Sequence, residues 1–122
     1  MGETILFFFR VSLSKFSLEA LFQSWDVIHT VGPIIETGVP TKDQEEQLAQ
    51  CYRSCLDLAE QAGLESIAFC CISTGVFHFP NERAAEIAIE AVKHYPRQSV
   101  KTIVFNVFLD KDYDIYLEKL KV

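Results

Sequence analysis

Short apolar runs alternate with helical patterns along the chain from Trp25 onward. The predicted strands cover residues 26–30, 66–72 and 102–109, and the predicted helices cover residues 41–62, 81–95 and 112–120. This alternating order predicts an α/β fold with a parallel or mixed sheet covered by helices. A further strand is expected at residues 4–10, which are apolar enough to join the sheet.

Local signals support these assignments. Thr41 stands three residues before Gln44, which is the spacing of a capping box at a helix start, and Gly63 suits a left-handed helix end. Residues with the spacing of one buried helical face follow the start: Leu48, Cys51, Tyr52, Cys55, Leu56 and Ala59. The run Ser66–Ile72 lacks alternation, which predicts a strand buried on both faces.

Length and charge limit the classes of partner. The chain has 122 residues, enough for one modest domain, and carries 17 carboxylates against 11 Lys and Arg. General attraction to nucleic acid or to an anionic membrane is therefore not expected. The run Ile5–Phe9 is too short to span a bilayer, and no signal peptide precedes the cysteines. We expect a cytoplasmic protein with reduced thiols.

The stretch from Ser73 to Pro80 joins the end of a predicted buried strand to the start of a predicted helix. Ligands in open α/β sheets collect at the carboxyl ends of strands, where a helix N-terminus offers unpaired N–H groups to an anion. Gly75 lets the backbone approach a ligand closely. The same spacing occurs in turns that only cap a helix, so spacing alone leaves phosphate binding and simple capping both open.

Several separated segments resemble the macro domain family. They are Val27-Ile28-His29-Thr30-Val31-Gly32-Pro33, Cys51-Tyr52-Arg53-Ser54-Cys55-Leu56, Ile67-Ala68-Phe69-Cys70-Cys71-Ile72-Ser73-Thr74-Gly75-Val76-Phe77, Ala84-Ala85-Glu86-Ile87-Ala88 and Val104-Phe105-Asn106-Val107-Phe108. The resemblance is strongest to bacterial protein-ADP-ribosylhydrolases. It implies a three-layer α/β/α sandwich with a mixed sheet that binds ADP-ribose, or an ADP-ribosylated protein, at the strand ends.

The resemblance also implies which residues contact the ligand. The family's second phosphate loop corresponds to Ser73–Phe77, so the expected diphosphate and distal-ribose contacts are Ser73, Thr74, Gly75, Val76 and Phe77. Phe108 takes the place of an aromatic residue beside the adenine, and a plain core Phe is the alternative. Asn106 is a weaker candidate for the same region.

The first half of the family pattern has no counterpart in the sequence. Residues 1–24 lack the family's early Asp, its Asn-Ala-Ala-Asn strand and its Gly-rich loop, so residues 25–122 correspond to the C-terminal half of an N-terminally truncated domain. The groups that position the attacking water, or bind zinc in some bacterial members, belong to that missing half. No catalytic residue is therefore assigned, and whether a zinc-dependent relative is the parent stays open.

No cofactor or metal is expected. The four cysteines, at positions 51, 55, 70 and 71, fit no known zinc-ligand spacing, and the three histidines are dispersed. The function expected is ADP-ribose binding related to ADP-ribosyl hydrolysis. The alternatives are a non-catalytic reader module and a remnant that binds nothing without a partner chain. Self-association through an exposed sheet edge is a further possibility.

Overall fold

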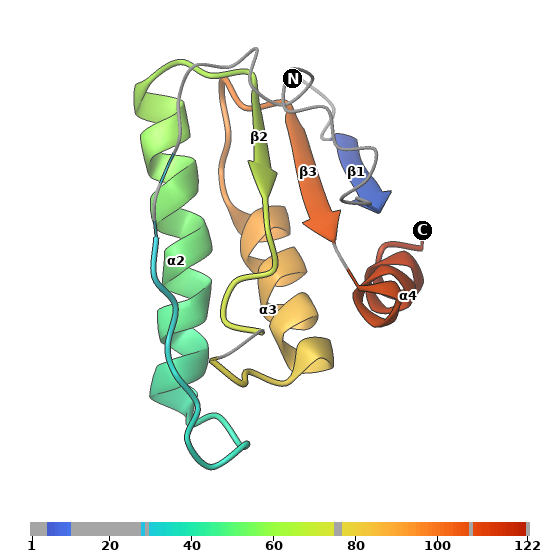
Figure 1. The fold of residues 1–122 in the computed structure, drawn as a ribbon. Helices are drawn as coiled ribbons and strands as arrows, with labels where there is room; N and C mark the ends of the chain where they lie inside the picture. The colour runs from blue at the N-terminus through green and yellow to red at the C-terminus, as the bar shows by residue number, and fades with distance from the viewer. Residues whose placement is uncertain (1–4, 11–27, 29, 75–76, 108, 122) are drawn as a thin grey trace.

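The computed structural model describes residues 5–10, 28, 30–74, 77–107 and 109–121 (Figure 1). Its elements follow the order β1 (Ile5–Arg10), α2 (Lys42–Gln61), β2 (Ser66–Phe69), α3 (Asn81–His94), β3 (Thr102–Val107) and α4 (Asp110–Lys119). Strands and helices alternate along the chain, so the predicted α/β class is confirmed.

The described strands form one sheet with the order β1-β3-β2. Both strand pairs are parallel, with Phe8 and Phe69 on either side of Phe105. The strand expected at residues 4–10 is thus confirmed, as β1. Because the strands are parallel, their carboxyl ends lie at one edge of the sheet. The chain passes from that edge into α3 after β2 and into α4 after β3 (Figure 1).

Helix α2 begins and ends as the sequence predicts. The Thr41 hydroxyl accepts a hydrogen bond from the Gln44 N–H at 3.1 Å, and the Gln44 side chain accepts one from the Thr41 N–H at 2.9 Å. These bonds satisfy two N–H groups at the helix start. Gly63 follows the helix with φ +68°, a left-handed conformation that glycine adopts without a Cβ clash. The predicted face is buried, except that Cys51 is half-buried.

The three helices cover one face of the sheet. Helix α3 lies between α2 and α4 and contacts both. Along β3 every second residue is buried, and the Phe105 ring packs against rings from β2 and α4 with centroids 6.1 and 5.0 Å away. Phe69 in turn packs against Tyr52 of α2. This chain of aromatic contacts links sheet and helices into one core.

Strand β2 differs from its prediction. It ends at Phe69 instead of Ile72, and Ser66 and Ala68 are exposed, so the expectation of burial on both faces is wrong. The physical reason is position: β2 is an edge strand of the described sheet, and the helices cover only the face that carries Phe69. Whether this edge serves self-association stays a prediction.

Two further differences concern the predicted strand 26–30 and the start of α4. Ile28 and Thr30 are not in a strand, and the rest of the predicted strand 26–30 includes Asp26, Val27 and His29, which lie outside the described residues. Helix α4 begins at Asp110, before the predicted residue 112, because the Leu109 carbonyl accepts the first helical hydrogen bond from Tyr113 at 3.0 Å.

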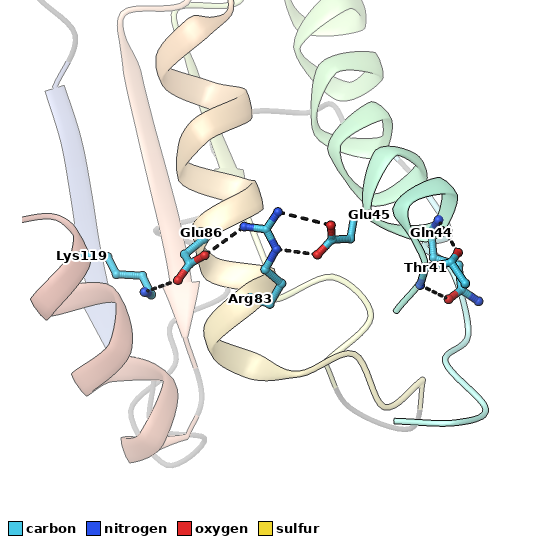
Figure 2. Close-up of polar contacts among 6 residues, drawn as sticks. All are labelled: Thr41, Gln44, Glu45, Arg83, Glu86 and Lys119. Atoms are coloured by element: carbon cyan, nitrogen blue, oxygen red, sulfur yellow. Dashed lines mark hydrogen bonds and ion pairs between the residues drawn. The ribbon is translucent and has the colours of Figure 1, made fainter. Parts of the chain in front are cut away.

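A series of ion pairs joins the three helices on their outer surface (Figure 2). Arg83 of α3 pairs with Glu45 of α2 and with Glu86 of its own helix at 2.9 Å, and Lys119 of α4 pairs with Glu86 at 3.0 Å. Such exposed pairs contribute about 0–1 kcal/mol each, so they favour a helix arrangement that the core already determines. Within the described part of the chain no helix is long and apolar enough to cross a membrane.

Candidate functional site

The segment between β2 and α3 lies at the carboxyl edge of the sheet, and within it a closed loop runs from Ser73 to Phe79. The Phe79 N–H donates a hydrogen bond to the Ser73 carbonyl at 2.8 Å and closes the loop. Ser73 and His78 have φ values of +66° and +61°, a left-handed conformation that is uncommon for residues with a Cβ. Left-handed residues near both ends of the loop indicate that its path is imposed by the surrounding structure.

Buried residues anchor this loop. Ile72 and Phe79, which flank it, are both buried in the core. The neighbouring segment of residues 32–35 adds a third attachment, because the N–H of the buried Ile35 donates to the Phe77 carbonyl at 2.8 Å. The loop is therefore anchored at its start, near its end and against its neighbour.

The Ser73 hydroxyl is the polar group within this loop that lacks a visible role in folding. Ser73 is 9% exposed, and its Oγ has no hydrogen-bond partner among the residues the structure describes. An unpaired buried hydroxyl costs on the order of 1–3 kcal/mol, so such groups are uncommon in folded proteins. A ligand that accepts or donates a hydrogen bond at this position would remove the cost.

The N-terminus of α3 lies directly after the loop. Pro80 occupies the N-cap position and supplies no side-chain hydrogen bond to the first turn. The first N–H groups of a helix carry a partial positive charge, which attracts an anion. Asn81 instead directs its side-chain amide to Asp112 of α4, with Nδ2 and Oδ1 2.6 Å apart. This bond holds the starts of α3 and α4 together at the same edge of the sheet.

The structure brings together part of the predicted ligand set. Ser73, Thr74 and Phe77 lie in the closed loop, where Thr74 donates to the Cys71 carbonyl at 3.4 Å and Phe77 is half-buried. Gly75 and Val76 lie outside the described residues, and so does Phe108.

Asn106 is the second-last residue of β3 and is half-buried. It lies on the opposite sheet face from its buried neighbours Phe105 and Val107, at the edge from which the loop starts.

Sequence reasoning did not identify Gly32 as part of the site. A Cβ placed on Gly32 would lie 1.9 Å from Ser73 Oγ, so the two residues are packed tightly together. Gly32 is far from Ser73 in sequence, and the Gly-Pro pair signals only a turn. The resemblance of residues 27–33 to the family was the available signal, but it carried no assignment of a contact.

Two ionisable groups lie beside the start of the loop. Burial raises the pKa of the Tyr52 hydroxyl, and the neighbouring Cys71 thiol raises it further. Burial likewise raises the pKa of Cys71 to about 12, with Asp112 contributing through its negative charge. These groups are therefore neutral near pH 7 and serve packing. Among the described residues no group of three His, Cys, Asp or Glu side chains is arranged to hold a metal ion.

Two open hollows are lined by residues outside the closed loop. One, of about 440 Å³, runs between α2 and α3 and is lined largely by charged residues such as Arg53, Arg83 and Glu90. The other, of about 380 Å³, lies between α2 and the segment 30–33. Neither is lined by Ser73, Thr74 or Phe77, so the larger hollow is not the site that the loop geometry indicates.

Comparisons with known proteins agree with this geometry. The family model for the Macro domain matches residues 17–88. A protein-ADP-ribose hydrolase of Staphylococcus aureus (strain Mu50 / ATCC 700699) is 52% identical over 96 residues, which are 77% of this chain and 36% of that protein.

Solved structures match the fold. The Oceanobacillus iheyensis macrodomain with ADP has a TM-score of 0.68 and 44% identity, over 75% of this chain and 48% of that one. The Trypanosoma brucei macrodomain in complex with ADP-ribose has a TM-score of 0.61 and 34% identity, over 63% of this chain and 34% of that one. The chain spans about a third of the length of the curated relatives it matches.

Proposed function

Because the chain belongs to the macro domain family, we propose that it binds ADP-ribose, free or attached to a protein, and that the Ser73–Phe77 loop holds the diphosphate. Relatives support the ligand: one solved neighbour contains ADP and another contains ADP-ribose. The position of the loop, at the carboxyl edge of a parallel sheet and before a helix N-terminus, supports the site.

The buried Ser73 hydroxyl is the observation that carries the proposal. It lies at the start of the closed loop and has no partner among the described residues. A diphosphate oxygen within hydrogen-bond distance of Ser73 Oγ would accept its hydrogen bond.

Charge makes local donors necessary. The chain has a net charge of −6, and residues 70–80 contain no Lys or Arg. The loop itself therefore offers a diphosphate no Lys or Arg side chain. Backbone N–H groups of the loop and of the first turn of α3, where no side chain caps the helix, supply the remaining hydrogen bonds.

With the diphosphate in this loop, the distal ribose and the adenine can be assigned to neighbouring residues. Phe77, half-buried at the far side of the loop, contacts the distal ribose. The end of β3 lies at the same edge of the sheet, so Asn106 and Phe108 border the adenine. For Phe108 this part of the proposal rests on its place in the sequence.

Binding, and not turnover, is the function we propose for this chain. The relative named as a hydrolase is about three times as long as the matched segment, and hydrolysis belongs to that whole protein. Turnover requires a group that positions water at the anomeric carbon, and no residue among those described is assigned that role. A reader module that binds without hydrolysis is therefore the form of the proposal that the described residues support.

Calorimetric titration of the folded chain with ADP-ribose tests the proposal. We expect saturable binding that Gly75→Glu weakens at least tenfold, because a carboxylate in the loop repels the diphosphate and fills its space. Gly63→Glu is the matched control: it adds the same charge at the opposite end of the sheet, after α2 (Figure 1). Absence of binding by the folded wild-type chain, or equal losses in both variants, would contradict the proposal.

A further inference from the structure

We infer that Gly32 is a positioning residue. It has no side chain, and its Cα packs directly against the Ser73 hydroxyl and so fixes the position of that hydroxyl. The ligand side of this inference rests on the proposed function, because Ser73 is the group that would meet the diphosphate. Its structural side rests on two contacts between the segment 32–35 and the closed loop.

The first contact is a close approach of backbone to side chain. A Cβ built on Gly32 would lie 1.9 Å from Ser73 Oγ, 2.8 Å from Ile72 Cγ2 and 3.2 Å from Ser73 Cβ. At two of these distances a real Cβ forces something to move. At the other described glycines, Gly38 and Gly63, an added Cβ would have nothing within 4 Å, and the positive φ is what favours glycine there. Space, not backbone conformation, is therefore what requires glycine at position 32.

The second contact lies three residues further along the same segment. The Ile35 N–H donates to the Phe77 carbonyl at 2.8 Å, and the Ile35 side chain is buried in the core. The segment thus meets the loop near its start, through Gly32, and near its end, through Ile35. Because Ile35 fixes the segment to the core, Gly32 cannot retreat without breaking this second contact.

A side chain at position 32 must therefore move Ser73 or Ile72. Ile72 is buried and Ser73 begins the closed loop, so displacement passes to the hydroxyl and to the bond between the Ser73 carbonyl and the Phe79 N–H. Hydrogen bonds weaken steeply when donor and acceptor separate by a few tenths of an ångström beyond their normal range. We therefore expect the loop to form in the variant but to bind ADP-ribose with a higher Kd.

Gly32→Ala, compared with Gly63→Ala, tests the inference. In Gly63→Ala the added methyl group meets open space and the cost is backbone strain at φ +68°, remote from the loop. In the ligand-free chain, we expect amide exchange at Ile35 and Phe79 to accelerate at least tenfold in Gly32→Ala relative to Gly63→Ala. We expect the Kd for ADP-ribose to rise about tenfold in Gly32→Ala and to stay unchanged in Gly63→Ala.

A double variant separates positioning from general destabilisation. Ser73→Gly removes the two Ser73 atoms that an alanine at position 32 would meet, and glycine tolerates the φ of +66° found there. In the Ser73→Gly background Ile72 Cγ2 is the remaining close atom, so Gly32→Ala should cause a smaller further change in amide exchange and in Kd than it does in the wild type.

Equal effects of Gly32→Ala in both backgrounds would overturn the inference, as would unchanged exchange at Ile35 and Phe79 in the single variant. The exchange measurement needs no ligand. A wild-type chain that fails to bind ADP-ribose would therefore contradict the proposed function, while amide exchange would still decide the role of Gly32.

Discussion

At the scale of single residues, the closed loop combines two features that folding alone does not favour. Ser73 and His78 adopt left-handed conformations that cost residues with a Cβ about 1 kcal/mol or more, and the Ser73 hydroxyl is buried without a partner among the described residues. Both features lie at the carboxyl edge of the sheet. Cost concentrated in one loop at such an edge is typical of a ligand site.

Replacing Ser73 by alanine distinguishes a ligand group from a structural one. Because the hydroxyl is buried and makes no hydrogen bond within the described residues, Ser73→Ala should leave the free energy of unfolding unchanged or raise it by up to about 1–3 kcal/mol. A hydrogen bond to a charged phosphate is worth about 1.5–3 kcal/mol, so the Kd for ADP-ribose should rise roughly tenfold or more. Urea unfolding and calorimetry measure the two quantities. A variant that loses stability but keeps its affinity would show that the hydroxyl serves the fold.

At the scale of elements, a carboxylate from α2 organises the turn that leads into β3. Glu60 accepts hydrogen bonds from the N–H groups of Gln98, Ser99 and Val100, at 2.9–3.1 Å, and from the Ser99 hydroxyl at 3.1 Å. These donors, the backbone of Val100 first, lower the pKa of Glu60 to about 2. A carboxylate in the last turn of a helix interacts unfavourably with the helix dipole. The hydrogen bonds from residues 98–100 offset this cost and explain why a Glu stands at position 60.

Glu60 makes stability depend on pH in a defined window. A carboxyl group whose pKa is lowered by folding stabilises the folded state above its unfolded value, near 4.5, and loses that contribution as the pH falls toward 2. Glu60→Gln should therefore flatten the fall in unfolding free energy between pH 4.5 and about 2, measured by urea unfolding at several pH values. Glu118→Gln, which removes a carboxylate paired only with Lys121 among the contacts described, is the matched control. Equal flattening in both variants would contradict this account.

The ends of an element could be predicted where short-range sequence signals mark them. The start of α2 at Thr41 and its end near Gly63 follow from capping chemistry that acts within a few residues. The end of β2 did not, because Cys70, Cys71 and Ile72 are as apolar as the strand before them. The chain leaves the sheet there because it must reach the left-handed turn at Ser73, and hydropathy does not encode that departure.

At the scale of the whole molecule, the sheet and its helices bring distant segments to one edge. The α/β class followed from alternation of apolar runs and helical patterns, whereas the loop proposed to bind the ligand was assigned from the resemblance to a family. The packing of Gly32 against Ser73 was beyond prediction because it depends on tertiary contacts between segments that no local pattern relates. Position in the fold therefore adds a residue to the site that sequence reasoning had interpreted only as a turn.

We propose that the loop after β2 receives the diphosphate of ADP-ribose. The most direct measurement is an NMR titration of the ¹⁵N-labelled chain, with ADP-ribose in one series and adenosine in the other. We predict that ADP-ribose shifts the amide signals of residues 73–79 and of the first turn of α3, that adenosine leaves these signals nearly unchanged, and that signals near Gly63 stay fixed in both series. Shifts confined to other parts of the chain, or equal shifts of the loop with both ligands, would contradict the account.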